Sequence, residues 1–216
     1  MQAQKWVLAS NNRGKLKELG ELLAPLGLTL HAQQELNVPE AEEPYATFIE
    51  NALTKARHAA RLTGLPALAD DSGICAPALL GAPGVHSARY ASEPGGVKSD
   101  AANNQKLVAQ LMARPELDRS VYYYCVLVLL RHEHDPQPII ADGRWHGVLI
   151  GEPLGEGGFG YDPYFYLPQL GKTAAQLDAS EKNQISHRGL AMRSLLAQIR
   201  GTNLCNNGLT PMKASA

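Results

Sequence analysis

The sequence predicts an α/β fold, chiefly because of the order of its first elements. An apolar run rich in strand-forming residues, KWVLAS at residues 5–10, leads into the polar loop NNRGK at residues 11–15. A helix is expected next, because leucines recur at helical spacing in LKELGELLAPLG, with Gly27 as its end. A strand, a polar loop and a helix in this order are typical of the start of an α/β protein.

Two elements are expected between residues 47 and 73. A second helix covers residues 47–64, because Thr47 and Glu50 fit a capping box and an apolar stripe runs along FIENALTKARHAA. Gly64 closes this helix. The segment LPALADDSG, at residues 65–73, has the composition of a short strand that ends in a turn.

The second half of the chain is expected to supply two more helices and the strongest strand. Residues 100–112 form a helix with its large apolar side chains on one face. SVYYYCVLVLLRH, at residues 120–132, is the strongest strand signal, and PIIADGRWHGVLIGEP has the pattern of a hairpin about Asp142-Gly143. A last helix covers residues 187–199.

Composition indicates an ordinary globular protein without a bulk attraction to polyanions. The 216 residues are 44% hydrophobic and 19% charged, and the formal net charge is -1. This balance excludes a disordered chain and gives no support for binding to nucleic acid or to a membrane surface. Cys75, Cys125 and Cys205 form no C-x-x-C pair, and the first residues hold too short an apolar run for a signal peptide. We therefore expect a reduced, cytoplasmic protein.

The domain organisation is expected to be simple. Glycine- and proline-rich stretches at residues 81–96 and 151–172 also hold reactive residue types, so we interpret them as site loops and not as linkers. We expect a single domain over residues 1–200. Residues 201–216 show no periodicity and are predicted to be a flexible tail.

The segment GEGGFGYDPYF contains a G-x-G-x-x-G pattern at Gly155, Gly157 and Gly160. A dinucleotide-binding turn requires a helix after the last glycine, but YDPYFYLP, with Pro163 and Pro168, predicts an extended segment. A kinase loop requires downstream motifs that the chain lacks. The pattern alone therefore leaves open a flexible hairpin or bulge.

Polar residues between the first strand and the first helix form a candidate phosphate loop. SNNRGK offers hydroxyl and amide groups, a glycine that permits close backbone approach, and Lys15 near a helix N-terminus. Main-chain N–H groups, the helix dipole and a cation can together hold phosphate. The alternative is an N-cap followed by a solvated Arg-Lys pair.

Carboxylates and cations supply two further candidate clusters. Asp70 and Asp71 end a predicted strand, where carboxylates are well placed for Mg²⁺, although DDSG also suits a simple turn. In KNQISHRG, Lys182 precedes a histidine and an arginine at the start of a helix, where cations are unfavourable unless an anion binds. Together with the glycine loop, these clusters suggest a nucleotide site with Mg²⁺.

Six ordered motifs carry a resemblance to a known family. LASNNRGKLKEL, EE with TFIENALTKARHAA, ALADDSG, GAPGVHSARY, GGFGYDPYF and ISHRG resemble the bacterial non-standard purine nucleoside triphosphate pyrophosphatases, which act on inosine and xanthosine triphosphates. The resemblance covers residues 5–200. It implies an elongated mixed β-sheet flanked by helices, two lobes with a central nucleotide cleft, and a homodimer. The implied reaction is Mg²⁺-dependent hydrolysis of ITP, dITP or XTP to the monophosphate and pyrophosphate, which removes these nucleotides from the pool.

The resemblance also implies roles for individual residues. Asp71 would be the general base and, with Glu42, a metal ligand, although the neighbouring Glu43 competes with Glu42 for that role. Lys55 would add charge beside the triphosphate, and Ser72 would touch the substrate. The triphosphate would be held by Ser10, Asn11, Asn12, Arg13, Gly14 and Lys15, and the base and sugar would be surrounded by Phe159, Gly160, Tyr161, Asp162, Lys182, His187 and Arg188.

Two alternatives stay open. A related pyrophosphatase acting on pyrimidine or modified nucleotides would share the phosphate machinery and differ in the base pocket. A nucleotide-sensing module would bind without turnover, but it would have no need of a positioned base such as Asp71. Hypoxanthine and xanthine carry an acceptor oxygen where adenine carries a donor amine, so donors from Arg188, His187 or the glycine-loop backbone could discriminate by roughly 10⁴.

Overall fold

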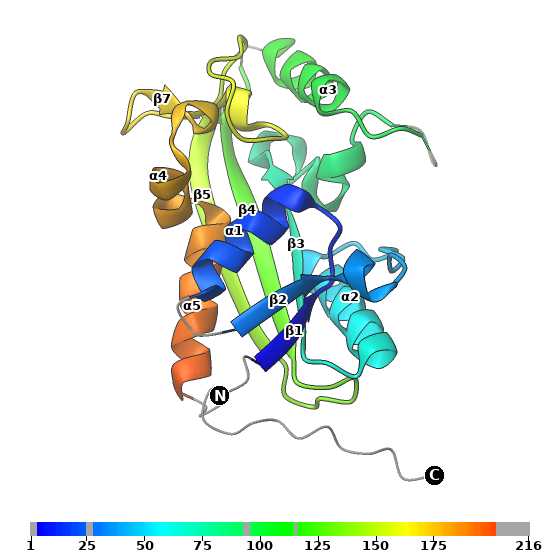
Figure 1. The fold of residues 1–216 in the computed structure, drawn as a ribbon. Coiled ribbons are helices and arrows are strands. Elements are labelled where there is room, and N and C mark those ends of the chain that lie inside the picture. Colours follow the sequence, from blue (N-terminus) through cyan, green and yellow to red (C-terminus); the bar gives the residue numbers. More distant parts are fainter. Residues whose placement is uncertain (1–3, 25–27, 93–95, 115, 202–216) are drawn as a thin grey trace. The chain divides into compact units, whose positions relative to one another are not determined.

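The chain forms a mixed seven-stranded sheet with helices against it (Figure 1). The computed structural model describes residues 4–24, 28–92, 96–114 and 116–201. The strand order is β2-β1-β3-β4-β5-β6-β7. Strands β1 and β2 are parallel, as are β1 and β3, whereas β5 and β6 are antiparallel. The strands are β1 Gln4–Leu8, β2 Leu28–Ala32, β3 Ala67–Cys75, β4 Ser120–Leu130, β5 Ile139–Leu149, β6 Phe165–Leu167 and β7 Lys172–Thr173.

Five α-helices and several short 3-10 turns accompany the sheet in the described part of the chain. The predicted helices at residues 47–64, 100–112 and 187–199 are confirmed, with small shifts at their ends. The first helix ends at Leu23, and its predicted stop, Gly27, lies outside the described residues. Among the described residues, no helix is long and apolar enough to cross a membrane. The helices are α1 Arg13–Leu23, α2 Phe48–Thr63, α3 Asp100–Met112, α4 Ala179–Ile185 and α5 His187–Gly201.

The chain divides into two compact units, each made of separate stretches of sequence. The first unit takes in the described parts of Met1–Asp71, Val126–Asp142 and Ala191–Ala216, and the second takes in Ser72–Cys125 and Gly143–Leu190. Strands β3, β4 and β5 each continue from one unit into the other. The predicted single domain over residues 1–200 stays a prediction, and the predicted tail lies outside the described residues apart from Gly201.

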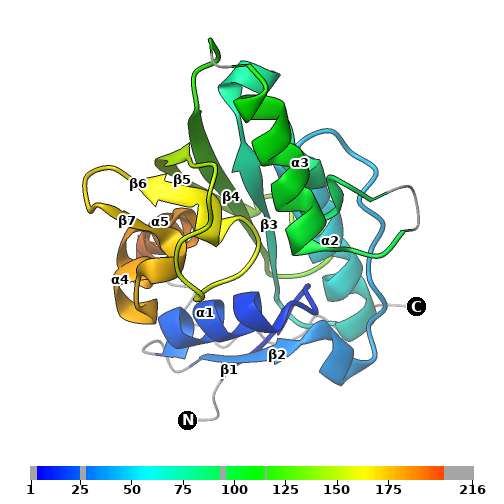
Figure 2. The same ribbon diagram turned by 90° about the horizontal axis from the view of Figure 1, so that it is seen from above.

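The first unit packs helices α1 and α2 beside its parallel strands. Helix α1 contacts β2, and α2 contacts β1 (Figure 2). The alanines of α2 face inward at helical spacing, so that this helix can lie close to the sheet. Thr47 caps the first turn of α2, because its side chain accepts a hydrogen bond from the Glu50 N–H. Gly64, in the left-handed conformation, is the C-cap that follows the last helical residue.

The second unit has a core of aromatic and aliphatic side chains. Trp145 and Phe165 pack with their ring centroids 4.9 Å apart, and Tyr123 lies 4.8 Å from Phe165. Gly147 is required where β5 passes this cluster, because a Cβ atom there would lie only 2.7 Å from the Phe165 ring. Buried side chains from α3, Leu107 and Leu111, complete the same cluster.

Two sequence-based predictions are wrong. No hairpin forms about Asp142-Gly143, because β5 runs straight through both residues from Ile139 to Leu149. Buried and exposed residues alternate without interruption along this strand, with Asp142 outside and Gly143 inside, so the strand pattern overrides the local turn signal. Residues 65–73 do not end in a turn either, since β3 continues to Cys75.

Packing explains why β3 extends past its aspartates. A side chain at Gly73 would collide with Gly84 and Ser87, so the glycine lets that neighbouring segment approach the strand. Ser87 Oγ then accepts a hydrogen bond from the Ile74 N–H at 2.9 Å. Glycine therefore serves close packing here and not a turn.

Strand β2 and helix α4 were not predicted from the sequence. Strand β2 has only five residues and pairs with β1 in the register Trp6↔Leu30. Helix α4 has a capping box formed by Asp178 and Glu181, a signal that the sequence does contain. The extended segment predicted after the glycine loop is found as β6, which a single 3-10 turn at Asp162–Tyr164 precedes.

Candidate functional site

The predicted phosphate loop connects β1 to α1 in the first unit. Asn12 is the N-cap of α1, and its side-chain oxygen accepts a hydrogen bond from the Lys15 N–H at 3.0 Å. Ser10 Oγ accepts from the Asn12 N–H at 3.2 Å. The first turn of α1 contains no acidic residue, so its N-terminal dipole is not neutralised from within the helix. Arg13 begins α1, but its side chain lies outside the described part of the chain.

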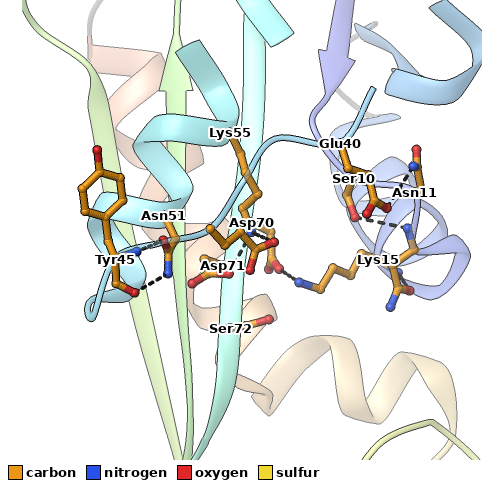
Figure 3. A network of polar contacts seen from close by, with 12 residues as sticks. Ser10, Asn11, Lys15, Glu40, Tyr45, Asn51, Lys55, Asp70, Asp71 and Ser72 are labelled. Atoms are coloured by element: carbon orange, nitrogen blue, oxygen red, sulfur yellow. Dashed lines mark hydrogen bonds and ion pairs between the residues drawn. The ribbon is translucent and has the colours of Figure 1, made fainter. Parts of the chain in front are cut away.

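Adjacent aspartates on β3 bind two different lysines (Figure 3). Lys15 forms an ion pair with Asp70, which is 1% exposed. Lys55 from α2 donates to Asp71 Oδ1 at 2.7 Å. Successive side chains on a strand point in opposite directions, which lets one aspartate hold each lysine.

Asp71 has one carboxylate oxygen engaged and one available. The residue is 6% exposed, and its Oδ2 accepts no hydrogen bond from any residue that the structure describes. Burial raises the pKa of Asp71 above its ordinary value, although Lys55 and Lys15 partly offset this effect. A carboxylate whose pKa is raised is a stronger proton acceptor than an ordinary one.

Lys55 stays charged in spite of its burial. Burial would lower the pKa of this lysine, but the charges of Asp71, Glu43 and Asp70 outweigh burial and raise the pKa. The ammonium lies 3.6 Å from Glu43 Oε1. Lys55 is therefore a fixed positive charge beside Asp71.

The acidic segment before α2 is tied to this network at several points. Asn51 of α2 exchanges two hydrogen bonds with the backbone of Tyr45, each 3.1 Å long, and Asn11 donates to Glu40 Oε1 at 3.1 Å. Glu43 points toward Lys55, whereas Glu42 is exposed. The described residues contain no group of three or more acidic, histidine or cysteine side chains that could hold a metal by themselves.

In the second unit, the Asp162 carboxylate is the central acceptor of a buried network. It accepts from Tyr123 Oη at 3.2 Å, from Lys182 Nζ at 2.6 Å and from the Phe159 N–H at 2.9 Å. Asp162 is only 2% exposed. The carboxylate thus fixes the end of the glycine loop, at Phe159, relative to β4 and α4.

Phe159 is the most exposed aromatic of the predicted base-binding set. Its side chain is 37% exposed, and its ring lies 5.1 Å from Lys182 Nζ and 5.9 Å from Arg188 Cζ. Arg188 also donates to Ser72 Oγ at 3.1 Å. The structure therefore brings Phe159, Lys182, Arg188 and Ser72 into one neighbourhood within the second unit.

His187 and Tyr161 are buried among other side chains. The His187 ring stacks on Tyr123 with centroids 4.6 Å apart and an interplanar angle of 9°. Tyr161 is 4% exposed, and its hydroxyl donates to the Ser87 carbonyl at 2.8 Å. Both residues anchor the elements that carry the exposed Phe159 and the buried Arg188.

The glycine loop uses some of its own N–H groups internally. The Phe159 N–H donates to Asp162, and the Gly160 N–H donates to Asp100 Oδ2 at 2.8 Å. These two groups are therefore engaged within the protein. Of the donors predicted to recognise a base, the Arg188 guanidinium can present several N–H groups at once.

Sequence reasoning missed partners that are distant in the chain. Asp70 holds Lys15, and Tyr123 supports both Asp162 and His187. The sequence shows Asp70 beside Asp71, which is a usable signal. Tyr123 lies within an apolar strand pattern that carries no sign of a polar role.

The chain is similar to known proteins over most of its length. A dITP/XTP pyrophosphatase from Ralstonia nicotianae is 64% identical over 194 residues, which cover 90% of this chain and 96% of the relative. One from Bordetella pertussis is 62% identical over 196 residues, covering 91% of each chain. Among solved structures, a HAM1 protein from Coxiella burnetii matches with a TM-score of 0.85 and 49% identity, covering 92% of this chain and 100% of that one.

A second structure, the Ham1 protein of Staphylococcus aureus, matches with a TM-score of 0.79 and 38% identity over 92% of this chain and 99% of that chain. The model of the Ham1 family matches residues 6–198. The resemblance inferred from the six sequence motifs is confirmed, and the chain belongs to the Ham1 family.

Proposed function

We propose that the chain hydrolyses deaminated purine nucleoside triphosphates, namely ITP, dITP and XTP, to the monophosphate and pyrophosphate. Relatives that carry the name dITP/XTP pyrophosphatase are more than 60% identical over about nine tenths of the chain. The structural observation that carries the proposal is the buried Asp71 carboxylate, with one oxygen held by Lys55 and the other available. Such a group is suited to accept a proton from an attacking water.

The residues present fit a divalent cation such as Mg²⁺. This ion takes one or two protein carboxylates together with phosphate oxygens and waters, so a cage of three protein ligands is not required. Asp71 Oδ2 would supply one ligand, and Glu42 or Glu43 the other. When bound, the cation would neutralise phosphate charge and lower the pKa of water.

The triphosphate would be bound by Ser10 to Lys15 and by Lys55. A polar loop with an uncompensated helix N-terminus favours phosphate, and Lys15 adds a positive charge that Asp70 holds in place. Asp71 would accept the proton of the water that attacks the α-phosphorus. The hydroxyl of Ser72, the residue that follows Asp71 in the chain, would contact the substrate.

The base would be recognised by the second unit. The exposed ring of Phe159 offers a stacking surface, and the cations Lys182 and Arg188 lie beside it. The guanidinium of Arg188 would donate to the oxygen at position 6 of hypoxanthine or xanthine and would meet a donor amine in adenine. In this proposal Gly160, Tyr161, Asp162 and His187 shape the pocket around these groups.

A parallel assay of pyrophosphate release tests the proposed function. ITP, XTP, dITP, ATP, GTP and dTTP are incubated with the protein and Mg²⁺, and pyrophosphate and orthophosphate are measured separately. Release of pyrophosphate from ITP, dITP and XTP far above that from ATP is expected. Failure to release it from ITP and XTP would refute the proposal.

Metal dependence gives a separate check. EDTA is expected to abolish pyrophosphate release from ITP, and an excess of Mg²⁺ over the chelator to restore it. Pyrophosphate release that persists in EDTA would show that the reaction does not require a metal, but it would not contradict the proposed substrates.

A homodimer and a cytoplasmic location belong to the same proposal. The chain has a mass of 23.3 kDa, so light scattering should give twice that value for a dimer. A cytoplasmic enzyme would meet the nucleotide pool before polymerases use it. Neither nucleic acid nor a membrane is required as a partner.

A further inference from the structure

Helix α3 holds the glycine loop, residues 155–160, through the backbone of Gly160. Asp100 and Asn104 are four residues apart, so they lie on the same face of the helix. The Gly160 N–H donates to Asp100 Oδ2 at 2.8 Å, and Asn104 Nδ2 donates to the Gly160 carbonyl at 2.8 Å. Both backbone polar groups of Gly160 are therefore held by α3.

These bonds act next to the exposed ring of Phe159. The Gly160 N–H belongs to the peptide that joins Phe159 to Gly160, so Asp100 fixes the orientation of that peptide. The preceding peptide is fixed by the bond from the Phe159 N–H to Asp162. With the peptides on both sides held, the direction in which the Phe159 side chain leaves the backbone is set.

Gly160 makes the loop dependent on this support. Its φ is +64°, which is a left-handed conformation. Glycine adopts this conformation readily, but it adopts many others as well, so the residue needs outside contacts to hold it there. Asn104 is only 5% exposed and also donates to the Asp100 carbonyl at 2.8 Å, so it ties the loop to the helix backbone in a site shielded from water. Loss of either side chain would release Gly160 to other conformations.

We propose that Asp100 and Asn104 are positioning residues that determine base specificity by fixing Gly160, and through it Phe159, without touching the substrate. The inference rests on the proposed function, in which Phe159 stacks on the base. The ring lies 5.9 Å from Arg188 Cζ, the group proposed to distinguish hypoxanthine from adenine. Misplacement of the ring therefore shifts a stacked base relative to Arg188 and leaves the charged groups around Asp71 in place. The loss therefore appears mainly in KM and in discrimination between ITP and ATP.

The test compares kcat and KM for ITP and ATP in wild-type protein and four variants. Asn104→Leu and Asp100→Leu remove one bond each, whereas Asp100→Asn retains an acceptor oxygen. Asn103→Leu is the matched control, because Asn103 is buried on the same helix but accepts from the Ala91 N–H and not from the loop. Melting temperature is measured for every variant.

Asp100→Leu and Asn104→Leu are each expected to lower the ITP-to-ATP ratio of kcat/KM by roughly tenfold, with kcat for ITP changed less than about threefold. Asp100→Asn is expected to stay within about twofold of wild type, and Asn103→Leu to keep the wild-type ratio even where its melting temperature falls. A partly unfolded sample lowers both activities equally, so the ratio separates positioning from stability.

An unchanged ratio in both Asp100→Leu and Asn104→Leu, with an active wild type, would overturn the positioning role alone. An equal fall of the ratio in Asn103→Leu would also overturn it. Should Asn104→Leu fail to fold, the pair Asp100→Leu and Asp100→Asn decides the question, because Asp100 is exposed in the first turn of the helix. A wild type that releases no pyrophosphate from ITP would refute the proposed function itself, and with it this inference.

Discussion

Asp71 has two carboxylate oxygens in different environments. Lys55 holds Oδ1 at 2.7 Å, while Oδ2 accepts no hydrogen bond among the described residues. The lysine thereby orients the carboxylate and leaves its second oxygen for chemistry. The sequence pointed to Asp71 through a family motif, but it could not show that Lys55, 16 positions away, binds it directly.

Replacing Asp71 by asparagine tests its role as base. Asp71→Asn is expected to lower kcat for ITP by roughly 10²- to 10⁴-fold, because the amide accepts no proton, while ITP binding measured by calorimetry persists. Asp142→Asn, at an exposed site on β5, serves as the control and should leave kcat unchanged. Near-normal turnover of Asp71→Asn would exclude Asp71 as the base.

Replacing Phe159 by alanine tests base stacking. Loss of a stacking surface worth about 1–3 kcal/mol should raise KM for ITP by roughly 5- to 150-fold with little change in kcat. Phe159→Trp retains an aromatic face and should bring KM back toward the wild-type value. An unchanged KM in Phe159→Ala would argue against stacking.

At the scale of elements, the turn between β4 and β5 lies at residues 131–138, before the Asp142-Gly143 pair where the sequence suggested one. Asp135 organises this turn by accepting hydrogen bonds from the Arg131 side chain and backbone and from the Gln137 N–H. A D-G pair is a strong local signal, but a continuous alternation of buried and exposed residues outweighs it.

The stability of this turn should depend on acid. Burial alone would raise the pKa of Asp135, but hydrogen bonds from Arg131 and Gln137 lower it to about 2. A lowered folded-state pKa gives stability that is complete above the ordinary value near 4 and is lost as pH falls toward 2. Because Arg131 is partly exposed and therefore screened, the contribution is about 1 kcal/mol and not the full value of the shift.

Urea unfolding of wild type and Asp135→Asn measures this contribution. The difference in free energy of unfolding should be about 1 kcal/mol at pH 7 and should shrink between pH 4 and pH 2. Gln137→Ala, in the same turn, removes no titratable group and is the control. A difference that is constant from pH 7 to pH 2 would show that the ion pair is not its source.

At the scale of the molecule, the predicted residues fall into two sets. The loop after β1, the aspartates of β3 and Lys55 of α2 belong to the first unit, and Phe159, Lys182 and Arg188 belong to the second. The main helices and the α/β class could be predicted because they follow from local periodicity and capping. The supporting contacts, such as Tyr123 with Asp162 or Asn104 with Gly160, join residues 39 and 56 positions apart and leave no local pattern.

Hydrolysis of ITP in ¹⁸O-labelled water tests most directly whether the chain cleaves between the α- and β-phosphates by attack on the α-phosphorus. With Mg²⁺ present, the proposed mechanism predicts one ¹⁸O atom in the inosine monophosphate and none in the pyrophosphate, determined by mass spectrometry. Label in the pyrophosphate would place the attack on the β-phosphorus, and labelled orthophosphate as the first product would place it on the γ-phosphorus. Either result would contradict the role assigned to Asp71 and its lysines.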